Sequence, residues 1–132
     1  MGKTVRYLLD THTLLWWLFD APELSPLARG LLAESQHTML VSSASAWEIA
    51  TKFRIGRLPS AEPLVQDFSK WITRAGFSEI AVTSAHAVRA GMFSHPHRDP
   101  FDRMLCAQSA IENAPLITTD NVLREFGVTV IW

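Results

Sequence analysis

The sequence predicts an α/β protein: a three-layer α/β/α sandwich built on a central, mostly parallel sheet of five strands. Short apolar segments rich in β-branched residues alternate along the chain with segments of helical periodicity. Because a helix between two strands acts as a crossover, the strands are expected to pair in parallel through right-handed connections. The chain has 132 residues, 48% of them hydrophobic and 19% charged. This composition predicts one compact domain over residues 1–132.

The boundaries of the elements follow from turn and capping residues. Ser25 before Pro26 and Asp99 before Pro100 mark helix starts, because proline suits the first helical position. Gly56 is expected to end the third helix. The expected strands cover residues 5–10, 39–42, 79–82, 116–120 and 128–131, and the expected helices cover 14–19, 27–35, 46–55, 64–74, 85–93, 100–113 and 121–126.

Charge and cysteine content exclude several classes of protein. The formal net charge of -1 provides no broad basic field for nucleic acid, so such binding must depend on local basic groups or bound cations. The single cysteine, Cys106, cannot form an internal disulfide and is expected to be a buried, small apolar residue. The longest apolar run, residues 14–19, is too short to cross a bilayer, and no signal segment is apparent. The expectation is a cytoplasmic protein without membrane contact.

Acidic residues recur where the expected strands end. Asp10 ends the first strand, Asp120 ends the fourth, and Glu48 lies near the start of the helix after the second. Asp99 and Asp102 open the helix that leads to the fourth strand. The carboxyl ends of parallel strands lie along one edge of a sheet, where open α/β sheets bind ligands, so these carboxylates are expected to converge. For Asp10 alone, capping of the next helix is the alternative role.

Such a cluster of carboxylates predicts a divalent cation. Two carboxylates about 4 Å apart repel by roughly 1 kcal/mol in water and by about 4 near a protein surface. Mg2+ or Mn2+ relieves this repulsion and prefers oxygen ligands. Zinc is a poorer candidate because the five histidines show no ligand-like spacing with Cys106, and His95 and His97 are expected in a solvated loop. Metal held by carboxylates commonly serves phosphoryl chemistry.

Four segments of the sequence stand out, in this order: LLDTH at 8–12, SAWEIATK at 45–52, HRDPFDRML at 97–105 and LITTD at 116–120. Together they resemble the successive blocks of PIN-domain ribonucleases of the VapC toxin type. The resemblance covers nearly the whole chain in the right order, and no departure is found at the acidic positions. It implies a PIN-like fold and cleavage of RNA phosphodiester bonds by a water activated by Mg2+ or Mn2+. It also implies a small cognate antitoxin and a toxin homodimer.

The resemblance also assigns roles to the acidic residues. Asp10 and Asp102 are implied as the main metal ligands and catalytic residues, with Glu48 and Asp120 completing the metal shell directly or through water. Asp99 is an additional acid in the third block.

Hydroxyl and basic side chains nearby are candidates for contacts to substrate. For the threonines, capping and turn formation are equally good roles, and for the basic residues a solvated surface charge is as good a role as a phosphate contact. These candidates are Thr11, Thr118, Thr119, Lys52, Arg98 and Arg103.

Two other functions remain open from the residues alone. A Mg2+-dependent phosphatase of the haloacid dehalogenase type also places an Asp after its first strand, but it needs a second acid where His12 stands here. A catalytically inert PIN-like interaction module is the other alternative.

The tryptophans divide into two groups. Trp47, Trp71 and Trp132 are expected in the core, whereas Trp16 and Trp17 are adjacent, so a helix cannot bury both on one face. One of these two is expected in the core or in contact with an antitoxin peptide, a second protomer or a stacked base.

Overall fold

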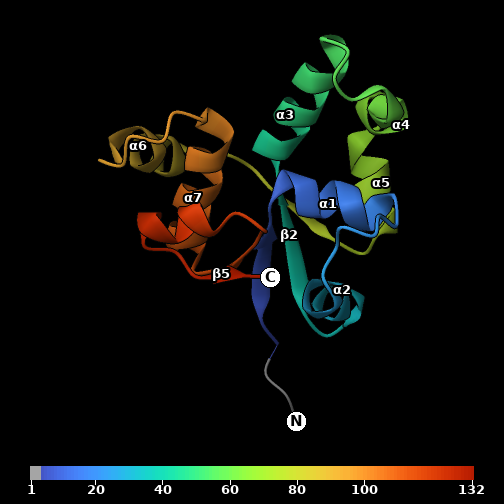
Figure 1. The fold of residues 1–132 in the computed structure, drawn as a ribbon, viewed down its shortest axis with the longest axis horizontal. Coiled ribbons are helices and arrows are strands. Elements are labelled where there is room, and N and C mark those ends of the chain that lie inside the picture. The colour runs from blue at the N-terminus through green and yellow to red at the C-terminus, as the bar shows by residue number, and fades with distance from the viewer. Residues whose placement is uncertain (1–3) are drawn as a thin grey trace.

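The structure is a computed structural model that describes residues 4–132, and its centre is a parallel sheet (Figure 1). The strand order is β3-β2-β1-β4-β5, and all four pairings are parallel. This arrangement confirms the predicted α/β class and the five strands. The strands are β1 (Arg6–Leu9), β2 (Thr38–Ser42), β3 (Ser78–Ile80), β4 (Leu116–Ile117) and β5 (Val130–Ile131).

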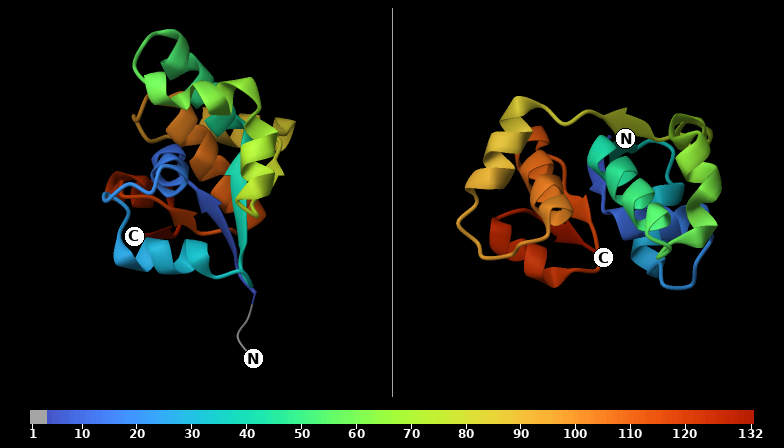
Figure 2. Two further views of the ribbon diagram at one scale, coloured as in Figure 1. Left: turned by 90° about the vertical axis from the view of Figure 1, so that its right-hand side faces the viewer. Right: turned by 90° about the horizontal axis from the view of Figure 1, so that it is seen from above.

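Helices cover both faces of the sheet and form the outer layers (Figure 2). Successive side chains of β1 point to opposite faces, so Tyr7 and Leu9 join one core and Leu8 joins the other. The first core lies under α1 to α5, and the second under α7 and η2. The helices are α1 (Thr11–Leu18), α2 (Pro26–Ala33), α3 (Ser43–Arg54), η1 (Pro59–Ala61), α4 (Glu62–Gln66), α5 (Phe68–Arg74), α6 (Ser84–Met92), α7 (Pro100–Glu112) and η2 (Asn121–Phe126).

Strand order creates a switch point beside β1. From β1 the chain adds β2 and β3 on one side, then returns across the sheet to add β4 and β5 on the other. The carboxyl ends of β1 and β4 therefore border the crevice where open α/β sheets bind ligands. In Figure 1, β1 and β2 run upward side by side, and α3 and α7 lie near their upper ends. The fold thus places α1, α3 and α7 around one edge of the sheet.

Several boundaries differ from the predicted ones because a different residue caps the helix. Helix α3 begins three residues earlier than expected, since the Ser42 hydroxyl accepts the amide of Ala44. Helix α6 is capped by Thr83, whose hydroxyl accepts the amide of His86. The expected helix 64–74 is divided at Asp67, which leaves helical geometry at φ -156° and caps α5. Strand β4 is also shorter than predicted, ending at Ile117.

Four of the five tryptophans pack against the first core. Trp71 and Trp132 are partly buried there, and so are both Trp16 and Trp17. Trp16 contacts the ring of Trp132, whereas Trp17 contacts Phe77, so the adjacent pair divides between two sides of α1. The predicted core position of Trp47 is wrong, because this side chain is 61% exposed.

None of the helices formed by residues 4–132 combines the length and the apolar character that a bilayer crossing requires.

Candidate active site

Asp10 is the buried carboxylate at the centre of the site. It follows β1 directly and retains only 7% exposure. Although it occupies the position before α1, its side chain makes no capping hydrogen bond to that helix. Instead the hydroxyl of Thr118 donates to Asp10 Oδ2 at 2.7 Å. Burial raises the pKa of Asp10, the Thr118 hydrogen bond opposes that change, and repulsion from Glu48 adds to it. The capping alternative for Asp10 is therefore wrong.

Glu48 brings a second buried carboxylate from α3. The side chain is 5% exposed and forms an ion pair with Lys52, one turn further along the helix. Because α3 begins at Ser43, Glu48 lies in the second helical turn. Lys52 thus neutralises an acid of the site, a role not considered for it from the sequence.

Asp102 comes from the first turn of α7. Its Oδ2 shares a 2.9 Å hydrogen bond with Nε2 of His97. Burial raises the pKa of Asp102 to about 6; the His97 hydrogen bond opposes this change, whereas repulsion from Asp99 and Asp10 adds to it. Asp99 itself is the N-cap of α7, as predicted, and accepts the amides of Phe101 and Asp102.

Asp120 follows β4 and is joined to Asp10 through Thr118. The backbone amide of Asp120 donates to the Thr118 hydroxyl at 3.1 Å, and that hydroxyl donates onward to Asp10. The carboxylate of Asp120 accepts the amide of Val122 and caps η2. Thr118 is fully buried and serves both acids, whereas Thr119 is exposed.

A buried thiol on α7 lies within the influence of three of these acids. Cys106 lies one turn beyond Asp102 on α7 and has no exposed surface. Burial raises its pKa to about 12, and repulsion from Asp102, Asp10 and Asp120 adds to the effect. Asp10 and Asp120 follow β1 and β4, and Asp102 opens α7, so these acids lie along the carboxyl edge of the sheet. Within residues 4–132, however, no three acidic, histidine or cysteine side chains converge tightly enough to form a ready metal site.

The other candidate residues have mixed positions. Thr11 is buried and hydrogen-bonded to the Ser45 hydroxyl at 2.9 Å, so it joins α1 to α3. Arg98 lies exposed in the loop before α7.

The structure gives Arg103 a role that differs from the two expected for it, a phosphate contact or a solvated surface charge. It is neither a solvated charge nor a free phosphate ligand, because its guanidinium donates to a set of backbone carbonyl groups. This contact fixes the end of α6 and the following loop against α7. The accepting carbonyls belong to Ala90, Gly91, Phe93, His95 and His97.

Sequence reasoning missed His97 as a residue of the site. The side chain was expected in a solvated loop, yet it contacts Asp102 and is only 25% exposed. Its position five residues before Asp102, just ahead of the helix start, was the available signal.

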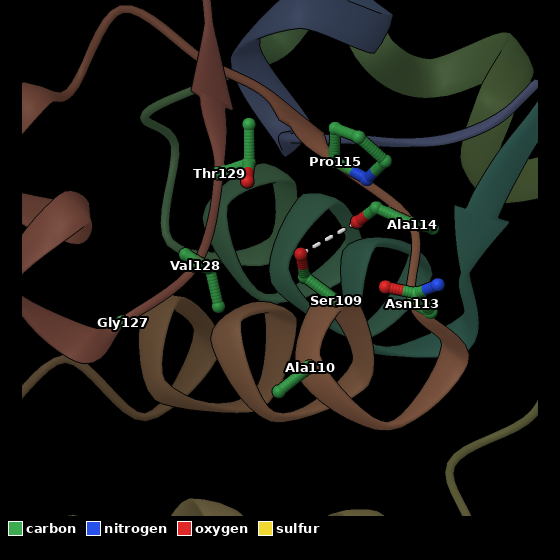
Figure 3. A pocket seen from close by; sticks show the side chains of 8 residues that line it. All are labelled: Ser109, Ala110, Asn113, Ala114, Pro115, Gly127, Val128 and Thr129. Atoms are coloured by element: carbon green, nitrogen blue, oxygen red, sulfur yellow. Dashed lines mark hydrogen bonds between the residues drawn. The ribbon is translucent and has the colours of Figure 1, made fainter.

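A separate pocket lies at the opposite edge of the sheet (Figure 3). It is lined by the end of α7 and by the segments that precede β4 and β5, including Asn113, Pro115 and Thr129. The hydroxyl of Ser109 donates to the carbonyl of Ala114 there. Because these segments enter the amino ends of the strands, the pocket contains none of the site acids.

An open parallel sheet with buried acids at its switch point defines the class of α/β proteins that bind ligands at the carboxyl edge. The sequence model of the PIN domain matches residues 7–128. The chain belongs to the PIN domain family.

The chain is also similar to a ribonuclease and to several solved structures. Ribonuclease VapC16 of Mycobacterium tuberculosis is 38% identical over 58 residues, which cover 44% of this chain and 41% of VapC16. The VapBC2 structure from Rickettsia felis, bound to a promoter DNA fragment, aligns with a TM-score of 0.70 and 16% identity over 96% of this chain and 98% of that chain. FitAcB from Neisseria gonorrhoeae aligns with a TM-score of 0.67 and 15% identity, covering 96% of each chain. At these identities the two structures establish a shared fold.

Proposed function

We propose that this PIN-domain protein is a Mg2+- or Mn2+-dependent endoribonuclease and the toxin of a toxin–antitoxin pair. The observation that carries the proposal is the position of the acids: Asp10 and Glu48 are buried beside the switch point, and Asp102 opens the neighbouring helix α7. A protein gains nothing in stability from gathering like charges in a poorly solvated place. Such a cluster is typical of a site whose counter-ion is a bound cation.

The donor set fits a hard divalent cation. Asp10 and Asp102 would be the main ligands, and Glu48 and Asp120 would complete the shell directly or through water. Among residues 4–132, Glu48, Asp102 and Asp120 each use one carboxylate oxygen in a side-chain hydrogen bond and leave the other without a donor. When bound, the cation lowers the pKa of water and offsets charge on the scissile phosphate.

Residues of the chain would orient the acids, accept the proton and contact the phosphate. Thr118 fixes the orientation of Asp10, Lys52 that of Glu48, and His97 that of Asp102. A carboxylate oxygen that does not hold the cation would accept the proton of the attacking water, and the 3'-oxygen would leave and take up a proton from solvent. Exposed Arg98 and Thr119 are the candidates for phosphate contacts.

A small antitoxin and a second copy of the toxin are the proposed protein partners. Support for the antitoxin comes from the structural neighbours, which include a toxin–antitoxin complex from Klebsiella pneumoniae and VapBC-1 from nontypeable Haemophilus influenzae. The alignment covers less than half the length of VapC16. Cleavage of RNA by this chain is therefore itself a proposal.

The deciding experiment is incubation of purified protein with total RNA in Mg2+, Mn2+ or EDTA, followed by mapping of the cut ends. We expect metal-dependent cleavage that is lost in Asp10→Asn by more than about a hundred-fold, since changes to residues around a metal ligand alone cost 10- to 100-fold. Expression in cells should arrest growth, and Asp10→Asn should restore it. Absence of cleavage with either metal would support the inert interaction module, and release of phosphate from a phosphomonoester through a phospho-enzyme would support the phosphatase.

A further inference from the structure

The segment between α6 and α7 forms neither helix nor strand and is held in place by side chains. Residues 93–99 connect Met92, the last residue of α6, to Pro100, the first residue of α7. Connections of this kind are usually the more mobile part of a fold. This one carries His97, whose ring contacts Asp102 of the candidate site at 2.9 Å. The position of that ring therefore depends on the contacts that hold the segment.

The guanidinium of Arg103 makes the largest set of these contacts. Its Nη1 donates to the carbonyls of His95 and His97, at 2.8 and 2.9 Å. Its Nη2 donates to the carbonyl of Phe93 at 2.6 Å, and its Nε donates to that of Ala90 on α6 at 2.9 Å. Arginine suits this task because it offers five N–H donors in one rigid plane, whereas lysine offers three donors on a single nitrogen atom. Arg103 thus fixes the path of the segment on which His97 lies.

His95 is the second residue that holds His97. The amide of His97 donates to Nδ1 of His95 at 3.1 Å, so Nε2 carries the proton of the His95 ring and lies 3.3 Å from Glu125 Oε2. The rings of both histidines contact Phe126 of η2, with centroids 4.7 Å away for His95 and 5.9 Å away for His97. The backbone amide, the backbone carbonyl and the ring of His97 are therefore each held by a named contact.

The contact from His97 to Asp102 orients a carboxylate of the site. A carboxylate has no proton to give, so Nε2–H of His97 donates to Oδ2 of Asp102. Asp102 and Arg103 are adjacent on α7, and the segment touches both: its carbonyls accept from Arg103, and its imidazole donates to Asp102. Movement of the segment away from Arg103 would therefore remove the bond that orients Asp102.

We propose that Arg103 and His95 are positioning residues for the metal site. They hold His97 where its imidazole orients Asp102, and their effect passes through that one hydrogen bond. This inference deepens the proposed metal-dependent function and rests on it. Residues that orient a metal ligand typically contribute about 10- to 100-fold to metal affinity or activity. Arg103 and His95 should therefore affect binding of the cation although neither is proposed as a ligand.

Binding of Mn2+ to the purified full chain, without RNA, tests the proposal. The Kd is measured by isothermal titration calorimetry at a temperature where circular dichroism shows each variant to be folded. Arg103→Lys keeps the positive charge but loses the planar set of donors, so it should raise the Mn2+ Kd by about 10- to 100-fold. Arg89→Lys is the matched control, because it makes the same chemical change at an exposed arginine of α6, and its Kd should not change.

Changes on the segment itself show whether the effect passes through His97. His97→Leu removes the donor to Asp102 and should raise the Kd over the same range, whereas His97→Gln keeps an N–H donor on a side chain and should restore most of the affinity. Arg103→Lys combined with His97→Leu should lose no more than His97→Leu alone, because both changes break one contact. His95→Leu releases the amide of His97 and should also raise the Kd. It leaves the guanidinium intact, so it tests the proposal even if Arg103→Lys does not fold.

The outcomes separate the positioning roles from the function on which they rest. A lower melting temperature with an unchanged Mn2+ Kd in Arg103→Lys and His95→Leu would make these residues anchors of the loop only and overturn the proposal. Losses that multiply in the double variant would also overturn it, since the residues would then act separately. If the variants lose Mn2+ as expected but the parent protein cleaves no RNA, the positioning roles stand and the ribonuclease function fails. A parent protein that binds no Mn2+ would overturn both.

Discussion

The two ends of α7 carry carboxylates in opposite situations. At the first turn, Asp102 lies near Asp10 and Asp99, and burial raises its pKa to about 6. At the last turn, Glu112 accepts hydrogen bonds from His86 at 3.1 Å and Arg6 at 3.2 Å, and these bonds lower its pKa. At the last turn of α7 the negative charge is therefore balanced by basic partners. At the first turn, at the other edge of the sheet, neighbouring acids leave it unbalanced.

The helix dipole alone would lower the pKa of Asp102 and raise that of Glu112, the opposite of what is found. A carboxylate is stabilised at a helix N-terminus and destabilised at a C-terminus, typically by about 0.3–1 kcal/mol. The shift at Asp102 from 3.8 to about 6 corresponds to roughly 3 kcal/mol between its protonation states. Burial and neighbouring charges therefore outweigh the dipole. The comparison teaches that the amino edge is built for stability, whereas the carboxyl edge carries a charge imbalance that binding can relieve.

Addition of a divalent cation should balance the negative charge at the first turn of α7 and so stabilise the folded protein. Mg2+ or Mn2+ at about a hundred times its Kd should stabilise the wild-type protein by roughly 2.7 kcal/mol. Thermal unfolding with and without metal measures this gain. Asp102→Asn should lose most of it, whereas Glu112→Gln, at the far end of the same helix, should keep it. Equal metal responses in both variants would contradict the asymmetry.

The pH dependence of stability should reveal Asp102 without any metal. Its carboxyl has a folded pKa of about 6 against an ordinary value of 3.8, so the folded state binds more protons between these values. Stability should fall as pH rises through this window, by up to roughly 2–3 kcal/mol from this group. Asp102→Asn should flatten that part of the curve and be more stable than wild type at pH 7 in EDTA. Denaturant unfolding from pH 4 to pH 7 provides the measurement, and an unchanged slope would contradict the expectation.

Asp99 tests whether neighbouring acids of α7 have separate duties. Because Asp99 accepts two amides at the start of the helix, Asp99→Ala should cost about 0.5–2 kcal/mol. Asp99→Asn still caps and should retain both stability and measurable cleavage, in contrast to Asp102→Asn. Chemical denaturation and a cleavage assay on the same preparations compare the variants. An inactive Asp99→Asn beside an active Asp102→Asn would reverse the roles.

The smallest effect is expected at the balanced end. Glu112 is partly exposed to solvent, so Glu112→Gln should cost less than about 1 kcal/mol at pH 7. Its folded pKa is lowered, which means that its contribution is present above the ordinary value and is lost as pH falls through the folded one. The stability difference between Glu112→Gln and wild type should therefore vanish in acid. A difference that persists at low pH would place the effect in packing.

The parts of this fold that follow local rules were predictable from the sequence. The apolar strands, the Ser25 and Asp99 caps and the order of strands and helices came from periodicity and capping chemistry, and the structure confirms them. Parallel pairing also predicted that Asp10 and Asp120 follow strands at one edge of the sheet, and the neighbouring positions of β1 and β4 confirm it.

Long-range contacts were beyond such rules. Thr118 lies 108 positions from Asp10, and only the strand order β2-β1-β4 brings them together. His97 and Arg103 acquire their partners from the path of a loop, which no periodicity encodes. The error at Trp47 came from treating an aromatic residue as core, although many apolar side chains remain at the surface.

The reactivity of the Cys106 thiol can report local opening of α7. It belongs to the second core, has no exposed surface, and its pKa is raised to about 12. Alkylating reagents attack the thiolate, so labelling requires that α7 first move away from the sheet and let the group ionise. The rate of labelling under native conditions then reports the fraction of molecules in which this helix has opened, and a ligand that bridges α7 to β1 would slow it.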